Sequence, residues 1–388
     1  MTNLANYYYI YTINDKPMET QSKRLLSLDA LRGFDMLFIM GFTSLVIGVC
    51  ALFPGGSEWW LSETMKHVDW NGLAHHDTIF PLFLFIAGVS FPFSYAKQLA
   101  SGMSKKSIYL KILRRALTLI ALGVVYNGFF KLDFENLRVA SVLGRIGLAW
   151  AGAAILFINF KPMTRAIIAV ATLIGYWLLI CYVPAPDVPG ANPLTIEGNL
   201  IGYIDRLLMP GRLIYDGGRF DPEGLLSTVP AVVTAMLGMF TGEFVKVSDE
   251  KISGNKKSLY MAAAAAALLI VGLLWSLVFP INKKLWTSSF VLVVGAYSLG
   301  MFALFYYIID VKGWQKWTLF FRVIGMNSIT IYMAQSIISF SGISRFFLGG
   351  VASHLPEAWG SVVLSFGYVA ACWLFLYFLY KKKVFLKI

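Results

Sequence analysis

Charged residues are scarce in this chain, and this shortage sets its class. Asp, Glu, Lys and Arg make up 14% of the 388 residues, while 57% are hydrophobic. An ordinary soluble domain carries about 25% charged residues, so the composition excludes a soluble protein. The chain is instead predicted to be an integral membrane protein whose 388 residues form a single domain in lipid.

Cysteine and histidine are also few. The three cysteines, Cys50, Cys181 and Cys372, fall in separate apolar runs without paired spacing, which excludes a disulfide framework and a cysteine metal cluster. His75 and His76 are adjacent, but no third ligand stands at a spacing typical of zinc sites. P-loop, GxGxxG, nucleophile-elbow and HExxH motifs are absent from the sequence. We therefore predict no metal and none of these enzyme classes.

Long apolar runs are abundant. A helix needs about 20 predominantly apolar residues to cross the hydrocarbon core of a bilayer. The predicted fold class is an all-α polytopic membrane protein, a bundle of about ten transmembrane helices. These helices are predicted near residues 34–53, 78–96, 112–130, 139–158, 166–183, 225–245, 259–281, 286–309, 319–340 and 361–380.

The basic residues are divided unevenly between the two ends of this bundle. With ten spans both termini lie on one side, and that side would hold 23 of the 33 Lys and Arg residues. Such an excess marks the cytoplasmic side, so residues 1–33 and the basic tail 381–388 are predicted to be cytoplasmic. The net charge of +12 then reflects membrane topology, and we expect no nucleic-acid partner. No removable signal peptide is apparent, so the first span is expected to direct insertion.

Two segments are predicted on the outer face. The longest connection, 184–224, is rich in aromatic and apolar residues, which argues against disorder and favours a cap over an outer pocket. The stretch "MKHVDWNGLAHHDTIFPLFLFIAG", 65–88, holds three of the four histidines directly before an apolar run. Histidine can accept a proton near neutral pH, so His67 is a candidate base. A histidine at a membrane boundary is also a common interfacial hydrogen-bonding residue.

Polar residues within or beside the spans have two interpretations each. Arg145 lies inside a predicted span, where a charge either faces a cavity or snorkels to the interface. Snorkelling is the favoured reading for Arg115, at the start of a span. Asn327 and Gln335 are predicted on about the same helix face. Each side chain either lines a passage between the helices or forms a hydrogen bond to a neighbouring helix, and for Gln335 the hydrogen bond is favoured.

A further polar cluster precedes the first predicted span. The segment "RLLSLDALRGFDM" brings together Arg24, Ser27, Asp29 and Arg32. The arginines are either a simple positive anchor or part of a phosphate cradle at a helix N-terminus. The spacing alone does not separate these two readings.

Eight motifs in register resemble one known family. They are "RLLSLDALRG", "KHVDWNGLAHHDTIFPLFLFIAG", "RVASVLGRIG", "GYIDRLLMPGRLIYDGGRFDPEGLLSTVPAVVTAMLG", "PINKKLWTSSF", "DVKGW", "GMNSITIYM" and "YKKKVFLKI". In order and spacing they resemble the heparan-α-glucosaminide N-acetyltransferase family, from Arg24 to Ile388. The resemblance implies a polytopic membrane enzyme that uses cytosolic acetyl-CoA to N-acetylate a terminal glucosamine across the membrane.

The resemblance also implies roles for single residues. The family's catalytic His falls on His67, and its acidic residue before "FP.F.F" falls on Asp77. His75 and His76 stand where the animal enzyme has apolar residues, so no catalytic role is carried to them. Thr43 stands where the animal enzyme has an Asn, which weakens any polar contact inferred there. The absence of a large domain before the first span suggests a bacterial enzyme of the cytoplasmic membrane.

A mechanism follows as an expectation. The pantetheine arm would thread between helices from a cationic inner mouth to His67, which would act as general base or be acetylated itself. A free or terminal glucosamine, or another amino sugar of the cell envelope, is an allowed acceptor, and a homodimer is possible. Predicted acetyl-CoA contacts are Arg24, Ser27, Arg32, Arg115, Arg145, Asn327 and Lys387. Predicted substrate contacts are Asp69, Asn71, Asp221, Glu223 and Trp286.

Two other functions remain open at this point. An amino-sugar or glycolipid transporter or flippase would also need about ten spans and an outer cap, although no inverted repeat is evident between 24–183 and 225–388. A membrane scaffold that binds polysaccharide without catalysis is the third possibility. Such a scaffold would need no cationic cluster opposite a histidine.

Overall fold

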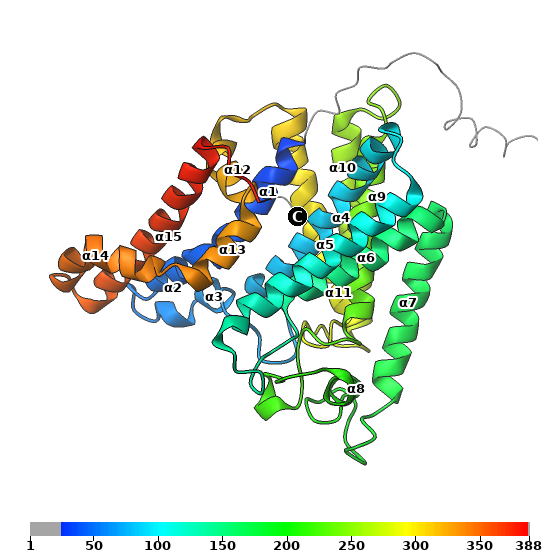
Figure 1. Ribbon diagram of the computed structural model, residues 1–388, viewed down its shortest axis with the longest axis horizontal. Coiled ribbons are helices and arrows are strands. Elements are labelled where there is room, and N and C mark those ends of the chain that lie inside the picture. The colour runs from blue at the N-terminus through cyan, green and yellow to red at the C-terminus, as the bar shows by residue number, and fades with distance from the viewer. Residues whose placement is uncertain (1–24, 387–388) are drawn as a thin grey trace, which may run out of the picture.

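The computed structural model describes residues 25–386, and this part of the chain contains helices and connections but no β-strand. The predicted all-α fold class is therefore confirmed. Figure 1 shows the helices in two groups, and α1 of the first group also contacts α4 and α11 of the second. The first group consists of α1 (Leu26–Leu37), α2 (Thr43–Cys50), α12 (Leu319–Gly325), α13 (Ser328–Ile337), α14 (Phe340–Ser353) and α15 (Glu357–Lys381).

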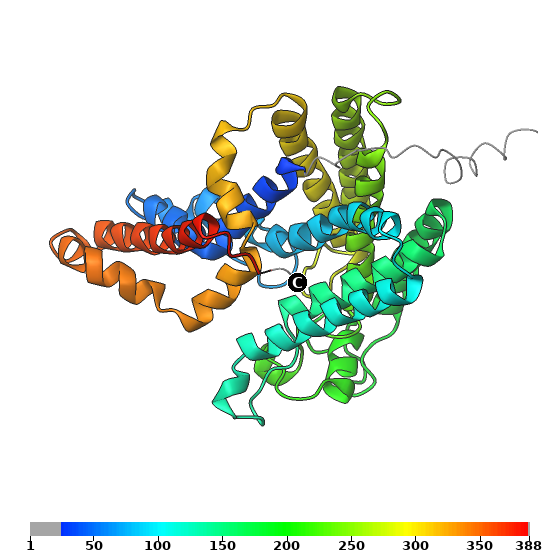
Figure 2. The same cartoon turned by 45° about the horizontal axis from the view of Figure 1, so that its top comes forward.

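The second group is larger and also remains together in the rotated view of Figure 2. It consists of α4 (His75–Ala100), α5 (Lys105–Tyr126), α6 (Val142–Asn159), α7 (Pro162–Tyr182), α9 (Thr228–Lys246), α10 (Gly254–Ser276) and α11 (Ser288–Phe305). Short helices α3 (Trp60–Glu63) and α8 (Leu200–Leu208) lie in connections.

The two ends of the bundle differ in what they carry. One end, here called the loop face, holds the connections 51–74, 127–141, 183–227 and 277–287. The segment 183–227, which contains α8, is called the cap. The opposite end holds the start of α1, the end of α15 and the connection between α9 and α10.

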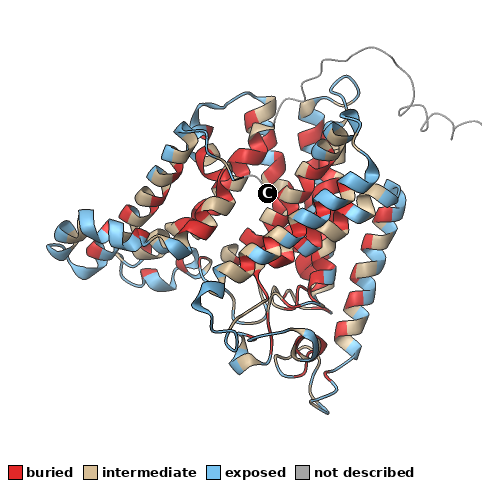
Figure 3. Cartoon of the chain, viewed as in Figure 1, coloured by how far each residue is buried: buried red, intermediate tan, exposed pale blue. Residues whose placement is uncertain are grey.

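Eight helices in the described part are long and apolar enough to cross a membrane. The bent pair α13 and α14, whose axes differ by 73°, would be a ninth. The predicted count of ten is not confirmed, since α5 carries five basic residues within its 22. Many exposed residues of these helices are large and apolar. Figure 3 shows that the buried residues lie mainly where helices pack against one another. This pattern is that of a polytopic membrane protein.

Two predicted spans need correction. The first begins at Leu26 rather than at residue 34, and it bends at Gly41, which has a φ of +100° beside a π-helical turn at Phe38–Phe42. The predicted span 319–340 is not one helix, because α12 ends at Gly325 and α13 starts at Ser328. Gly325 packs against α1 so closely that a Cβ there would lie 1.9 Å from the carbonyl oxygen of Asp29.

Close contact between α4 and α9 fixes the helix that begins at the histidine cluster. A Cβ at Gly88 would lie 2.2 Å from the carbonyl oxygen of Ala235, and one at Gly238 would lie 2.1 Å from that of Phe85. Small residues let two membrane helices approach in this way. The backbone of α4 is therefore held rigidly, with its N-terminus at the loop face.

Candidate active site

The loop face contains a hydrogen-bonded pair formed by His67 and Asp77. His67 Nδ1 lies 2.6 Å from Asp77 Oδ1. The other carboxylate oxygen, Oδ2, accepts hydrogen bonds from the backbone N–H groups of Val68, at 3.3 Å, and Ala74, at 3.2 Å. Because Asp77 lies in the first turn of α4, its carboxylate also faces the positive end of the helix dipole. One acidic side chain thus fixes both the imidazole and the backbone around it.

This pairing defines the roles of the two imidazole nitrogens. An ionised carboxylate only accepts hydrogen bonds, so Nδ1 of His67 carries the proton and donates it to Asp77. In the neutral ring Nε2 is then the acceptor. The His67 side chain is 55% exposed, so this nitrogen can be reached from outside the protein. The arrangement is that of an oriented general base.

Lys283 completes the group from the far connection 277–287. Its Nζ lies 3.2 Å from Asp77 Oδ1 and 3.3 Å from His67 Nδ1. Because Nδ1 bears a proton, the ammonium group donates to the carboxylate. Burial lowers the pKa of Lys283, an effect opposed by the neighbouring carboxylates of Asp77 and Glu223. The sequence analysis assigns no role to Lys283. The only indication in the sequence that it belongs to the site is its position in the motif "PINKKLWTSSF".

Of the two remaining histidines of the cluster, only His76 lies against His67. The His76 ring centroid lies 4.4 Å from that of His67, and His76 Nδ1 is 3.4 Å from Thr43 Oγ1. His75 points elsewhere, with Nε2 3.3 Å from the hydroxyl of Tyr297. The departures from the animal family at Thr43 and His76 therefore lie in contact with each other beside His67.

Asp69 and Asn71 tie the histidine segment to its neighbours. The carbonyl oxygen of Asp69 accepts hydrogen bonds from the hydroxyl of Tyr215 in the cap, at 2.8 Å, and from Lys284. Asn71 Oδ1 accepts one from Asn282 Nδ2 at 3.1 Å. In the described contacts Asp69 thus acts through its backbone, and its carboxylate stays available for a ligand.

Two predicted substrate contacts prove to be anchors of the cap. Asp221 is fully buried, and its carboxylate accepts hydrogen bonds from Arg138 Nε, at 2.8 Å, and from Arg138 Nη2, at 2.7 Å. Glu223 pairs with the same guanidinium. Burial lowers the pKa of Arg138, but the two carboxylates outweigh burial and raise it. Asp221 therefore holds the cap to the connection 127–141.

Arg145 and Trp286 lie beneath this anchor. Arg145 occupies the first turn of α6, is buried, and donates hydrogen bonds to the carbonyl of Pro222 and, at 2.5 Å, to Ser227 Oγ. Its guanidinium carbon lies 5.0 Å from the centre of the fully buried Trp286 ring. Arg145 thus binds the cap, at the end opposite to the predicted nucleotide site, and Trp286 supports it.

Asp205 gives the cap a dependence on pH. Its side chain in α8 is buried, and Oδ1 accepts a hydrogen bond from the backbone N–H of Leu225 at 3.0 Å. Burial raises the pKa of Asp205 from 3.8 to about 7. Between these two values the folded protein binds more protons than the unfolded chain does, so stability falls as the pH rises from about 4 to about 7 and then levels off.

We expect the Asp205→Asn variant to lose this dependence. Over that interval, Asp205 should weaken the folded state by up to about 1.4 kcal/mol per pH unit. The melting temperature of the variant, measured in detergent from pH 4.5 to 8, should therefore rise relative to wild type as the pH increases. Asp187→Asn, which alters an exposed carboxylate, serves as the control. A constant difference between wild type and Asp205→Asn across this range would contradict the assignment.

The comparisons with known proteins agree with the resemblance in the motifs. The mouse protein named heparan-alpha-glucosaminide N-acetyltransferase is 29% identical over 423 residues, which covers 95% of this chain and 61% of the mouse protein. The human protein of the same name is 28% identical over 418 residues, with 94% and 60% covered. The chain is therefore similar, over nearly its whole length, to two proteins of this name. It spans about three fifths of the length of these relatives. No family model matches the chain.

The predicted acetyl-CoA contacts at the opposite end are only partly assembled. Arg24 and Lys387 lie outside the described residues. Arg32 and Arg115 come from α1 and α5, one from each helix group, and they are close enough for their charges to interact. The Arg115 guanidinium lies 4.1 Å from the centre of the Trp150 ring. Ser27 is buried, and its backbone N–H donates to Asp310 at 3.3 Å.

Asn327 and Gln335, from the same predicted span, have different partners. Asn327 precedes α13 and binds the C-terminal tail, with Nδ2 3.0 Å from the carbonyl oxygen of Val384. Gln335 Oε1 accepts a hydrogen bond from the hydroxyl of Tyr368 on α15 at 3.0 Å, which is the contact between helices favoured from the sequence. Asn327 therefore holds the tail between the two helix groups, near the centre of Figure 1.

Proposed function

We propose that this protein is a transmembrane N-acetyltransferase that moves the acetyl group of cytosolic acetyl-CoA to the amino group of a glucosamine-type sugar. The observation that carries the proposal is the oriented His67–Asp77 pair at the loop face. The relatives that align with 95% and 94% of the chain carry the name of such an enzyme. The proposed location is the cytoplasmic membrane of a bacterium, with both termini inside and the loop face outside.

The basic residues support this orientation. The loop face holds Lys66, Lys131, Arg138, Arg145, Arg206, Arg212, Arg219, Lys283 and Lys284, but most of the Lys and Arg residues of 25–386 lie at the other end. Such an excess is expected on the cytoplasmic side. The proposed phosphate contacts, Arg32 and Arg115, also lie at that end. Two like charges held near each other are relieved by an anion, and arginine binds phosphate through two parallel hydrogen bonds.

The proposed chemistry needs one proton acceptor at the outer end. The amine of the sugar attacks the thioester carbonyl, His67 Nε2 takes a proton from the nitrogen, and the C–S bond breaks to release CoA. Asp77 remains ionised and stabilises the imidazolium that forms. In the alternative route the same nitrogen attacks the thioester first, and an acetyl-imidazole then transfers the acetyl group to the amine. Both routes use the same free nitrogen.

A direct assay tests the function. The purified protein would be incubated with labelled acetyl-CoA and a panel of free and terminal amino sugars, and product formation would be measured. We expect N-acetylation of at least one glucosamine derivative and a rise in melting temperature with CoA concentration. A transporter or flippase would instead move an amino sugar across a vesicle membrane without acetylating it, and CoA would leave its melting temperature unchanged.

We expect Lys283 to hold the Asp77 carboxylate in place beside His67. Its Nζ lies 3.2 Å from Asp77 Oδ1, the oxygen that also accepts the hydrogen bond from His67. In Lys283→Met this charge-assisted contact is lost, and kcat/KM for the proposed reaction should fall about tenfold. Lys283→Arg keeps the charge and should retain most of the activity.

The matched control for this experiment is Lys284→Met. Lys284 is the next residue, but it contacts the carbonyl of Asp69 and the ring of Tyr215, so its loss should lower kcat/KM less. An equal loss in both variants that Lys283→Arg does not recover would reduce Lys283 to a packing role.

A further inference from the structure

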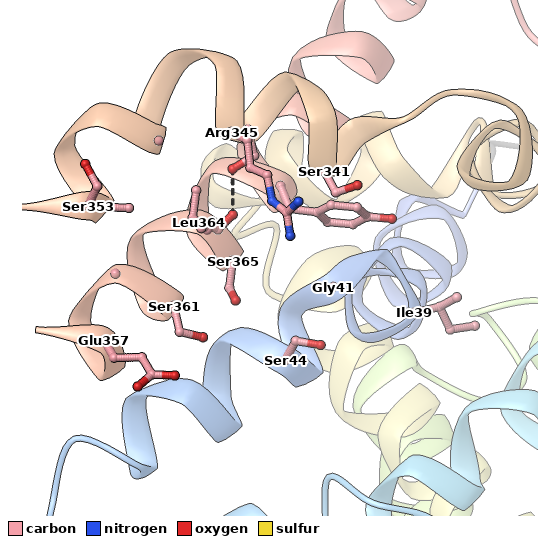
Figure 4. A pocket seen from close by; sticks show the side chains of 15 residues that line it. Ile39, Gly41, Ser44, Ser341, Arg345, Ser353, Glu357, Ser361, Leu364 and Ser365 are labelled. Atoms are coloured by element: carbon pink, nitrogen blue, oxygen red, sulfur yellow. Dashed lines mark hydrogen bonds between the residues drawn. The ribbon is translucent and has the colours of Figure 1, made fainter. Parts of the chain in front are cut away.

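A polar cavity lies between α2, α14 and α15, outside the His67 site. Its volume is about 870 Å³. Figure 4 shows the Arg345 guanidinium and the hydroxyl groups of Ser44, Ser361 and Ser365 extending into the space between the α14–α15 hairpin and α2. The cavity residues with polar side chains are Ser44, Ser341, Ser344, Arg345, Ser353, Glu357, Ser361, Ser365 and Tyr368.

The polar residues of α15 form one stripe along the cavity. Glu357, Ser361, Ser365 and Tyr368 recur every three or four residues, which places them on one helix face. The remaining surface of α15 is mostly apolar, and the helix is a candidate membrane span. Polar groups at membrane depth need partners. A cavity lined by them therefore holds water or a polar ligand.

Arg345 is the feature that selects the ligand. In the described part of the chain, the residues 25–386, neither Arg345 nor Glu357 has a hydrogen-bond or ion-pair partner. Ser344, next to it, donates to the carbonyl of Leu364, so Arg345 lies level with Ser365, about 12 Å along α15 from Glu357. The Arg345 side chain is exposed toward this space. Its guanidinium is therefore accessible to an anion that enters the cavity.

The surroundings of the cavity indicate how such an anion would arrive. Phe346 and Phe347 on α14 are 82% and 73% exposed, and Trp359 on α15 is also exposed. Tryptophan is enriched where a membrane meets water, and exposed phenylalanine rings offer apolar surface to acyl chains. A ligand with a polar head in the cavity would lay its apolar chains against these rings. A soluble anion would make no use of them.

We propose that this cavity binds the phosphate headgroup of a lipid that also carries free hydroxyl groups. Arg345 holds the phosphate, while the serine hydroxyls and the Glu357 carboxylate bind the hydroxyls. Both a phospholipid of the bilayer and a lipid-linked sugar phosphate have this chemistry. The site does not depend on acetyl transfer, although Gly41 and Ser44 line the cavity only a few residues from Thr43, which contacts His76.

Native mass spectrometry of the protein in detergent tests the site. Added probes would be phosphatidylglycerol, a glycosylated polyprenyl phosphate, phosphatidylcholine and inorganic phosphate. We expect one molecule of a hydroxylated anionic lipid per chain, with the fraction bound at a fixed lipid concentration reduced about tenfold in Arg345→Gln. Arg114→Gln changes an exposed arginine of α5 outside the cavity and should bind as wild type does.

A second variant separates a lost ligand contact from a folding defect. Ser361→Ala with Ser365→Ala leaves the charge in place, so phosphatidic acid should still bind while the preference for phosphatidylglycerol over phosphatidic acid disappears. Whichever of the two hydroxylated lipids binds more tightly identifies the source of the headgroup. Equal retention of phosphatidylcholine, undiminished binding to Arg345→Gln, or full displacement by millimolar inorganic phosphate would each overturn the proposal.

Discussion

Replacing His67 with alanine should abolish most of the acetyl-transfer activity. Removal of a positioned general base typically lowers the rate about 10²–10⁴-fold, and His67 Nε2 is the nitrogen that Asp77 leaves free to accept a proton. We expect kcat/KM to fall within that range while the stabilisation by CoA persists, because Arg32 and Arg115 lie at the other end of the bundle. The measurement is initial-rate kinetics with labelled acetyl-CoA and the best amino-sugar acceptor.

His354→Ala provides the control, since His354 lies at the exposed end of α14. Equal product formation by wild type and His67→Ala would exclude His67 as the catalyst. If kcat/KM falls as expected, a rapid-quench experiment without acceptor separates the two routes. Labelled acetyl bound to the protein and lost in His67→Ala would establish the acetyl-imidazole route, whereas its absence would favour the direct one.

The pairing of His67 with Asp77 is the part of the site that sequence reasoning came nearest to. Both residues lie in one motif, ten positions apart. Because Asp77 lies in the first turn of an apolar helix, its carboxylate is expected near the connection that precedes the helix. Lys283 is different, because 216 positions separate it from His67. No local pattern reports such a distance, and only the folding of 277–287 onto the histidine segment brings them together.

The cap shows why acidic residues are difficult to interpret from sequence. The sequence predicts Asp221 and Glu223 as substrate contacts, but it does not reveal that Arg138, 83 residues earlier, donates hydrogen bonds to the Asp221 carboxylate. A similar limit applies to the predicted span 319–340. Hydropathy averages over about 20 residues and cannot detect the break between Gly325 and Ser328, which depends on the close approach of α1.

The second large effect is expected at Arg138, the anchor of the cap. Its guanidinium pairs with two acidic side chains, Asp221 and Glu223, and the pair with Asp221 is buried. Removing one partner of a buried ion pair costs about 3–5 kcal/mol, because the other charge is left without compensation. Arg138→Met should therefore lower the melting temperature by several degrees, expose the cap to proteolysis and reduce kcat/KM, since the cap also contacts Asp69 and Trp70 beside His67.

Two further variants identify the cause of this loss. Arg206→Met breaks a partly exposed pair with Asp187 in the same cap, and a pair of that kind is worth at most about 1 kcal/mol. Its melting temperature should therefore stay close to that of wild type. The triple variant Arg138→Met, Asp221→Asn and Glu223→Gln removes all three charges together and should recover part of the stability lost in Arg138→Met. If Arg138→Met cost no more than Arg206→Met, the cap would be held by its apolar contacts around Phe220 and Ile201, and its docking would not depend on charge.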